Sequence, residues 1–403
     1  MLRSDRLLTR RREHGRGRLR RRETMIWAAG LVLVAGWLLF DLHGKRAASP
    51  SSGTVRVAAE ALPAAPLDAR ERASGVWTGK EAIYWGGRSG GQTDTRFFAD
   101  GAAYDPSAGR WRRIAPAPLS ARSGHTAVWT GREMVIWGGR ADQGRTLSDG
   151  AAYDPARDRW HRLPSAPQGA GREYGKAIWF RNLLIVGAGA DSGDAGRTLL
   201  AYSPATRRWR TFELARQVYD LAAGDRALYA LTYDRRSRAV AVTEIRPLAD
   251  ETRVLPEPPA DGPPDGLGLT WSGDRLLLTL GTETRSRVLQ FSRGHWSPAG
   301  SAAAADFHPP VSPGMDPQAR FSAWTGHSLL NYSPNGLESY VPRAGAVQRI
   351  EGRYGRERGY CGAGAAVVWT GSEIISWSGQ SCRTGADPQT ATGLRITVTY
   401  PNA

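Results

Sequence analysis

The chain has 403 residues, of which 41% are hydrophobic, and a formal net charge of +16. This composition excludes a disordered chain and a membrane protein with many spans. Two cysteines are too few for a disulfide framework or for a zinc site built from several cysteine ligands. The positive total raises the question of a nucleic-acid partner, but a total does not say where the charge lies.

The N-terminal segment has the pattern of a membrane-targeting sequence. Residues 1–23 hold ten arginines and three acidic residues, a net charge of +7, and residues 24–40 follow without a charged side chain. As a helix the uncharged run would be about 25 Å long, at the short end of what crosses a bilayer. We therefore predict a basic cytoplasmic tail (1–23), a single transmembrane signal anchor (24–41) and a flexible linker (42–54), with the rest outside the cytoplasm.

Signal-peptide cleavage is the alternative, because Ala47, Ala48 and Ser49 are small enough for a peptidase. The protein would then be secreted. In either topology +7 belongs to the tail and +1 to residues 25–46, so that +8 remains on residues 47–403. This modest excess gives little support to a nucleic-acid partner, and we predict none.

Residues 55–403 contain seven copies of one unit. The strong copies are GVWTGKEAIYWGG from Gly75, AVWTGREMVIWGG from Ala127 and AVVWTGSEIISWSGQ from Ala366, and weaker ones begin at Ala177, Leu221, Leu269 and Ser322. In the first three copies a Tyr-Asp-Pro or Tyr-Ser-Pro follows, with a tryptophan seven residues after the tyrosine. Each unit reads as four short strands in about 50 residues, the pattern of a propeller blade.

This pattern resembles the bacterial Kelch repeat family. The resemblance implies an all-β fold, a seven-bladed Kelch-type β-propeller over residues 55–403, preceded by the single transmembrane helix. Kelch propellers include enzymes, sugar binders and protein scaffolds, so the resemblance alone implies no activity. The last copy ends at Tyr400-Pro401 and lacks an outer strand. We expect residues near Val55 to Leu62 to supply that strand and close the ring.

The two cysteines belong to the last unit. Cys361 and Cys382 lie at nearly equal distances on either side of the turn at Thr370-Gly371. Antiparallel strands around that turn would place them opposite each other, which predicts a disulfide bond and an oxidising compartment. Two unpaired thiols are the alternative.

Arginines recur in the loops that lead into the first strand of each unit. Arg70, Arg122 and Arg172 stand nine residues before the turn position, Arg216 is displaced by one residue, and Arg320 and Arg358 lie in equivalent loops. We predict that they ring the mouth of the central channel and bind carboxylate or phosphate groups. Their polar neighbours would be Glu173, Tyr174, Asp220, Asp265 and Tyr360. In the alternative interpretation these arginines hold carbonyl and carboxylate groups of neighbouring blades.

No catalytic triad, phosphate loop or metal motif stands out, and we predict neither a metal nor a cofactor. Asp100-Gly101 and Asp149-Gly150 occupy matching loop positions, where turn formation is the simplest role. The sequence favours a membrane-anchored extracytoplasmic propeller that binds a partner protein or an anionic cell-envelope glycan without catalysis. The alternative is a carbohydrate-active enzyme, a sugar mutarotase or lyase, with its site at the channel mouth.

Overall fold

The computed structural model describes residues 56–400 with internal gaps. The gaps are residues 92–93, 168, 188–195, 235–236, 238, 260–265, 282–284, 304–320, 327, 334–335, 342–345, 351–363 and 381–389. The predicted tail, anchor and linker lie outside the described residues. Within the described part, no helix has the length and apolar character needed to cross a membrane.

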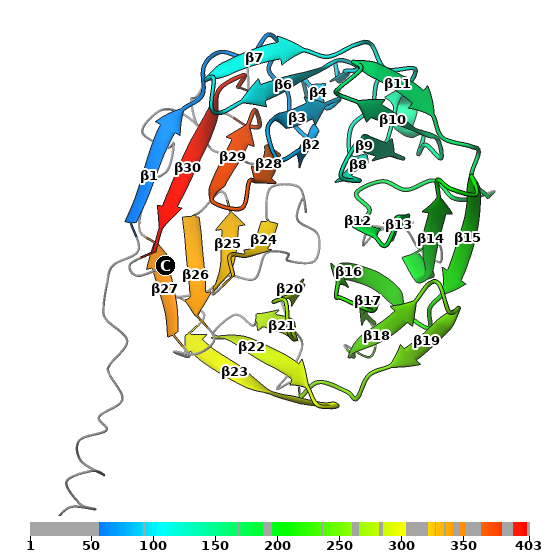
Figure 1. Ribbon diagram of the computed structural model, residues 1–403, viewed down its shortest axis with the longest axis vertical. Helices are drawn as coiled ribbons and strands as arrows, with labels where there is room; N and C mark the ends of the chain where they lie inside the picture. The colour runs from blue at the N-terminus through cyan, green and yellow to red at the C-terminus, as the bar shows by residue number, and fades with distance from the viewer. Residues whose placement is uncertain are drawn as a thin grey trace, which may run out of the picture. The chain divides into compact units, whose positions relative to one another are not determined.

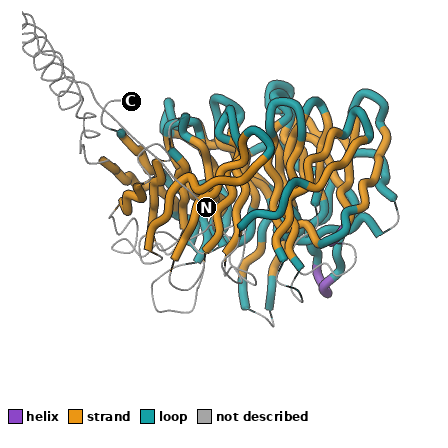
Figure 2. The backbone as a smooth tube through the Cα atoms, turned by 90° about the horizontal axis from the view of Figure 1, so that it is seen from below, coloured by secondary structure: helices purple, strands orange, loops and turns teal. Residues whose placement is uncertain are grey.

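Seven four-stranded antiparallel sheets follow one another around a ring (Figure 1). This confirms the predicted all-β, seven-bladed propeller. In each blade the first strand lies nearest the centre and the outer strand lies at the perimeter (Figure 1). Seen from the side, the strands run between two faces that are closed by loops (Figure 2).

The first three blades are built from short strands. Blade 1 contains β2 (Ser74–Trp77), β3 (Ala82–Trp85), β6 (Gly101–Asp105) and β7 (Arg110–Arg113), with the small hairpin of β4 (Arg88–Ser89) and β5 (Arg96–Phe97) between β3 and β6. Blade 2 contains β8 (Thr126–Trp129), β9 (Met134–Trp137), β10 (Gly150–Asp154) and β11 (Arg159–Arg162), with the 3-10 helix η1 (Asp142–Gly144) after β9. Blade 3 contains β12 (Ala177–Phe180), β13 (Leu183–Val186), β14 (Thr198–Ser203) and β15 (Arg208–Glu213).

Blades 4 and 5 have longer strands, and blade 6 has strands of about the same length as those of blade 3. Blade 4 contains β16 (Gln217–Ala223), β17 (Leu228–Tyr233), β18 (Val240–Arg246) and β19 (Glu251–Val254). Blade 5 contains β20 (Gly266–Trp271), β21 (Leu276–Gly281), β22 (Arg285–Ser292) and β23 (His295–Ala303). Blade 6 contains β24 (Phe321–Trp324), β25 (Leu329–Ser333), β26 (Gly336–Val341) and β27 (Ala346–Ile350).

Blade 7 joins the two ends of the propeller. It contains β28 (Ala366–Trp369), β29 (Glu373–Trp377), β30 (Gly393–Thr399) and, as its outer strand, β1 (Arg56–Ala61). Arg56 pairs with Thr399 and Ala61 pairs with Leu394. The N-terminal strand thus lies where the repeat alignment placed it, and it covers a sheet edge that would otherwise be open to other chains.

The core lies between neighbouring blades rather than inside one of them. All four residues of β3 and of β9 are buried, as expected for strands that are covered on both faces. Trp85 of blade 1 and Ile136 of blade 2 belong to one apolar cluster, and six further clusters of this kind are present among the described residues. Each blade is therefore held in place by burial of apolar surface against its neighbours.

Tryptophans of the outer strands add hydrogen bonds between blades at the perimeter. Trp160 donates its indole N–H to the carbonyl of Ala115, in the segment that joins blades 1 and 2, over 2.8 Å. Three equivalent tryptophans donate to the preceding joining segment in the same way: Trp111 to Pro63, Trp209 to Pro164 and Trp296 to Pro256. These side chains are used by the fold and are not free for ligand stacking.

The glycine pairs allow close approach of backbone between blades. Gly87 and Gly139 have φ values of +106° and +94°, which other residues rarely adopt. Gly87 donates its N–H to the carbonyl of Arg122 over 2.8 Å, and Gly139 donates to Arg172 over 2.7 Å. Since a Cβ on Gly87 would lie 2.9 Å from the carbonyl oxygen of Glu71, no larger residue fits there. These contacts fix the loops that carry the candidate site.

Candidate binding site at the inner rim

The lead-in loops, which precede the first strand of each blade, lie beside the loops that join the second and third strands. Antiparallel pairing of β2 with β3 brings the start of one to the end of the other. Residues Glu71 and Arg88 form an isolated bridge at this point in blade 1, and Ser123 and Arg140 form the same bridge in blade 2. The two kinds of loop therefore form one continuous surface at this end of the inner strands.

Two of the predicted site residues are buried beneath this surface. Arg70 and Arg122 have no exposed surface. Arg70 donates to the Asp100 carboxylate over 2.7 Å and to the carbonyl of Gly86. Arg122 makes the corresponding bonds, to Asp149 over 2.8 Å and to the carbonyl of Gly138. Each guanidinium thus ties a lead-in loop to the next loop of its own blade.

The Asp-Gly positions found in the sequence are the acceptors of these bonds. Burial lowers the pKa of Arg70 from its usual value, and the hydrogen bond with Asp100 opposes that shift. Arg172 is also buried, but it donates to the carbonyls of Gly169 and Gly171 in its own loop. As in the alternative interpretation, these arginines hold carbonyl and carboxylate groups, but the groups belong to the arginine's own blade and not to a neighbouring one. A ligand-binding role for them stays a prediction.

Of the remaining predicted arginines, Arg216 belongs to the described residues. Arg216 is half-buried and lies directly before β16. Arg320 and Arg358, with Asp265 and Tyr360, lie outside the described residues, as do Cys361 and Cys382, so that the disulfide stays a prediction. Among the described residues, no group of three or more histidine, cysteine or acidic side chains is placed to hold a metal ion.

A string of backbone hydrogen bonds connects four lead-in loops above the buried arginines. Arg72 donates its N–H to the carbonyl of Gly364 over 2.7 Å, Gly124 donates to Arg72 over 3.4 Å, and Tyr174 donates to Gly124 over 2.8 Å. These four residues occupy the same repeat position in blades 7, 1, 2 and 3. All have positive φ values, between +53° and +70°. Two of the four are glycine, whereas Arg72 and Tyr174 adopt this conformation against their steric preference.

The side chains of Arg72 and Tyr174 meet above the glycine between them. The Arg72 guanidinium carbon lies 5.0 Å from the centre of the Tyr174 ring, within the range of a cation–π contact. A Cβ on Gly124 would come within 2.9 Å of that ring. The glycine therefore makes room for the tyrosine, and the three residues form a platform of one cation and one aromatic ring.

Two ion-pair groups border the platform, and Arg72 itself takes part in the first, with its Nε 3.7 Å from the Glu71 carboxylate. Glu71, whose side chain is 7% exposed, accepts from Arg88 over 3.0 Å and from the Gln380 amide over 3.2 Å. On the other side Arg140 lies 3.9 Å from Glu173, and the Arg140 side chain is 46% exposed. We name Glu71, Arg72, Arg88, Arg140, Glu173 and Tyr174 the inner rim. It holds three guanidinium groups against two carboxylates.

Asp220, another predicted neighbour, lies farther along the inner strands. It follows a β-bulge in β16 and accepts from the backbone N–H groups of Leu221 over 2.9 Å and Leu269 over 3.0 Å. Lys176 lies 3.8 Å from it, at the start of β12. Asp220 thus connects the inner strands of blades 4 and 5, with Lys176 of blade 3 beside it.

Sequence reasoning placed Glu173 and Tyr174 near the site but missed Arg72, Arg88 and Arg140. A signal was present in the repeats. Arg72 and Tyr174 stand two residues after the repeated arginines, where blades 2 and 7 have glycine, and Arg88 and Arg140 directly follow the glycine pairs. Residues that replace glycine at a position with positive φ are good candidates for a functional role.

Comparisons with known proteins give one family match and one similar solved structure. Residues 59–228 match the family model of the KLHDC2/KLHL20/DRC7 Kelch-repeats domain. Among solved structures, the chain is similar to that of YjhT, with 12% sequence identity, a TM-score of 0.46, and coverage of 84% of this chain and 99% of that one. No curated protein matches the chain. With its seven four-stranded sheets, the chain is a β-propeller, and the Kelch-repeats model matches it from β1 through blades 1 to 3 to the start of β17 in blade 4.

Proposed function

We propose that this propeller is a binding module and that its inner rim recognises the carboxylate of an anionic glycan. The observation that carries the proposal is the backbone conformation of Arg72 and Tyr174. Each has φ above +50°, a conformation that costs a residue other than glycine on the order of 1–3 kcal/mol. Blades 2 and 7 avoid this cost with glycine, whereas in blades 1 and 3 the two side chains meet at the rim, which supports a role in binding.

The chemistry of the rim suits such a ligand. Guanidinium groups bind carboxylates through two parallel N–H donors, and an aromatic ring supplies an apolar face with a hydroxyl at its edge. Arg88 is engaged with Glu71, while Arg140 is nearly half exposed and, within the described part of the chain, has only a long contact with Glu173. Arg140 is therefore the natural partner for a ligand carboxylate, with Tyr174 beside it.

Strain and binding can be separated by experiment. Arg72→Gly and Tyr174→Gly remove the side chains and relieve the strained backbone. We expect each variant to bind at least tenfold more weakly on an array of anionic glycans, with the free energy of unfolding unchanged within about 1 kcal/mol. Arg207→Gly is the matched control, because Arg207 is exposed and has a φ of +56° at a turn of blade 3.

The control should change neither binding nor stability. If the two rim variants bind like the unchanged protein, or if they unfold far more easily, the rim has a structural role and the proposal fails. The bound glycan should also be followed by NMR. Conversion of the sugar by the unchanged protein would replace the binding function by the enzymatic alternative.

We also propose that residues 24–41 anchor the propeller to the outer side of a membrane. The support is the uncharged run of residues 24–40 behind a tail of net charge +7. The full chain should stay with membranes after alkaline extraction, and its mass should include residues 1–46. Release into the soluble fraction with a new N-terminus near Ala48 would instead establish cleavage and secretion.

A further inference from the structure

A second charged surface lies at the perimeter, away from the inner rim. The outer strands of blades 1, 2 and 3 each begin with an arginine followed by a tryptophan: Arg110, Arg159 and Arg208. All three arginines are exposed, and none makes a side-chain hydrogen bond or ion pair within the described residues. We name these three residues the outer arginine belt. They recur once per blade along strands that follow the perimeter of the ring (Figure 1).

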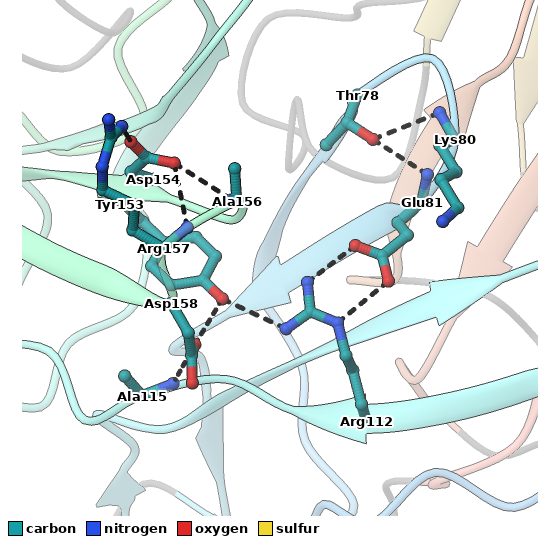
Figure 3. A network of polar contacts seen from close by, with 10 residues as sticks. All are labelled: Thr78, Lys80, Glu81, Arg112, Ala115, Tyr153, Asp154, Ala156, Arg157 and Asp158. Atoms are coloured by element: carbon teal, nitrogen blue, oxygen red, sulfur yellow. Dashed lines mark hydrogen bonds and ion pairs between the residues drawn. The ribbon is translucent and has the colours of Figure 1, made fainter.

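The acidic groups near the belt are occupied by other partners (Figure 3). Asp154 accepts from Arg157 over 2.6 Å and from Arg132 over 3.3 Å, and it caps its own turn through the N–H of Ala156. Asp158 accepts from the Tyr153 hydroxyl over 2.6 Å. The carboxylates beside Arg159 therefore hold the fold, and they leave its guanidinium exposed to solvent.

The same is true in blade 1. Glu81 is bound by both nitrogens of the Arg112 fork, over 2.9 and 2.7 Å (Figure 3). Asp105 accepts from the backbone and the hydroxyl of Ser107. Internal pairing of the acids and exposure of the first arginine of the outer strand thus occur together in consecutive blades.

Blade 4 shows that an outer strand does not need this arrangement. Its strand β19 has Glu251 paired with Arg246, and Arg253 of the same strand pairs with Glu244 over 2.8 Å. There the exposed charges neutralise each other. Protection of a sheet edge from aggregation needs charge but does not require that the charge be unpaired and of one sign. The belt in blades 1–3 therefore calls for a further explanation.

We propose that the outer arginine belt binds a linear polyanionic glycan that follows the perimeter of blades 1 to 3. Guanidinium groups bind carboxylate, sulfate and phosphate oxygens in a forked geometry, and charges repeated along an edge match charges repeated along a polymer. The strands β7, β11 and β15 follow one another along the perimeter in Figure 1, so a flexible chain that runs along this edge can reach all three arginines.

The tryptophans that follow the belt arginines argue against single-stranded nucleic acid as the ligand. Such polymers are held by bases stacked on exposed aromatic rings. Here the tryptophan after each belt arginine is packed against a tyrosine of its own blade, with ring centres 5.0 Å apart, and its N–H is bound to a joining segment. A polymer that needs only charge and hydroxyl contacts fits the surface better.

The test compares two triple variants of the full chain, each losing three positive charges. The belt variant is Arg110→Gln with Arg159→Gln and Arg208→Gln. The control is Arg246→Gln with Arg253→Gln and Arg275→Gln, which removes paired arginines of blades 4 and 5. Both variants keep the basic N-terminal tail, so its contribution is the same in each.

Binding of heparin and of polygalacturonate is measured against salt concentration. We expect the belt variant to bind about tenfold more weakly, with a salt dependence lower by roughly two to three released counterions. The control should change less than twofold. An equal loss of glycan affinity in both variants would show an effect of net charge only. No loss of affinity in either variant would assign binding to the basic tail. Each of these two results overturns the proposal.

Two further probes separate the other polyanionic partners. Vesicles with a high content of anionic lipid and a single-stranded oligonucleotide are tested with the same two variants. If the belt variant loses binding to either of these but keeps its affinity for both glycans, the surface serves that partner and the proposal is wrong. Failure at the inner rim would leave this result unaffected, since none of the altered residues belongs to it.

Discussion

Blades 1 and 2 and blades 4 and 5 solve the same packing problem in different ways. In blades 1 and 2 the inner strands have only four residues, and a buried arginine fastens the lead-in loop. In blades 4 and 5 the corresponding strands have seven and six residues, and the outer strand of blade 5 has nine. In blades 4 and 5 longer backbone ladders thus take the place of the buried arginine.

The difference explains why only some blades carry a candidate site. A short strand with a long loop places variable side chains at the inner rim, and the buried arginine gives that loop a fixed shape. A longer strand continues the regular ladder into the same region and leaves less loop to vary. Binding residues are more often carried by loops on a rigid scaffold, so the rim of blades 1 to 3 is the better candidate for function.

The largest expected effect comes from removing a loop fastener. Arg122→Ala loses the hydrogen bonds to Asp149, Gly138 and Ser120 and leaves buried carbonyls without donors. We expect a loss of about 3 kcal/mol in the free energy of unfolding, measured by chemical denaturation. The matched change in blade 4, Arg216→Ala, should cost less than about 0.5 kcal/mol because Arg216 is only half-buried and makes no described side-chain bond.

Ligand binding by the Arg122 variant also bears on the sequence prediction. If it stays folded and binds glycans normally, the arginine serves the fold alone. If it keeps full stability but loses binding, the loop-fastening interpretation is wrong and the predicted arginine ring is restored.

A pH effect of intermediate size should arise in blade 2. His125 is buried and lies edge-on to Trp85, and burial lowers its pKa to about 3, with the charge of Arg122 acting in the same direction. The unfolded chain, with a histidine pKa near 6.5, binds more protons between these values. Stability from the neutral histidine is therefore complete above about pH 6.5 and is lost as the pH falls, by about 2 kcal/mol at pH 5.

His125→Ala tests this effect, because blade 1 has alanine at the same repeat position. The variant should be less stable at pH 7.5, since it leaves a cavity, but its stability should fall less between pH 7.5 and pH 5. Parallel pH profiles for the two proteins would mean that His125 titrates in the same way in the folded and the unfolded chain. The predicted pH effect would then be wrong.

Much of the fold could be predicted because each blade repeats its local signals. The turn glycines, continuous apolar runs and outer-strand tryptophans indicated the number of blades. The missing outer strand of the last copy indicated which strand closes the ring. They were informative because they act within one unit. Even blades 4 to 6, where the motif is eroded, keep the apolar pattern that packs between neighbours.

The site was harder to predict because it depends on contacts between units. The sequence showed Arg70 and Arg122 as a repeated pattern, but it did not show that Asp100 and Asp149 lie within reach and bury them. The stacking of Arg72 on Tyr174 likewise depends on the space left by Gly124, a residue of the blade between them. Repeats reveal equivalent positions, while packing decides which of them remain accessible.

The smallest expected effect belongs to Asp220, which connects blades 4 and 5. Its two carboxylate oxygens accept one backbone N–H each, from Leu221 and Leu269. Asp220→Asn offers only one oxygen, so its amide nitrogen must face the other donor. We expect a loss of about 1–2 kcal/mol in the free energy of unfolding, since one buried hydrogen bond is lost and the contact with Lys176 is weakened.

Asp250→Asn is the control, because Asp250 is 65% exposed and its ion pair with Arg210 should contribute little. A clear difference between the two variants would show that blade 4 depends on a side-chain fastener as blades 1 and 2 do, with a carboxylate in place of a guanidinium. Equal and small effects would mean that the backbone ladders of blades 4 and 5 suffice to hold their inner strands, and the contrast with blades 1 and 2 would be complete.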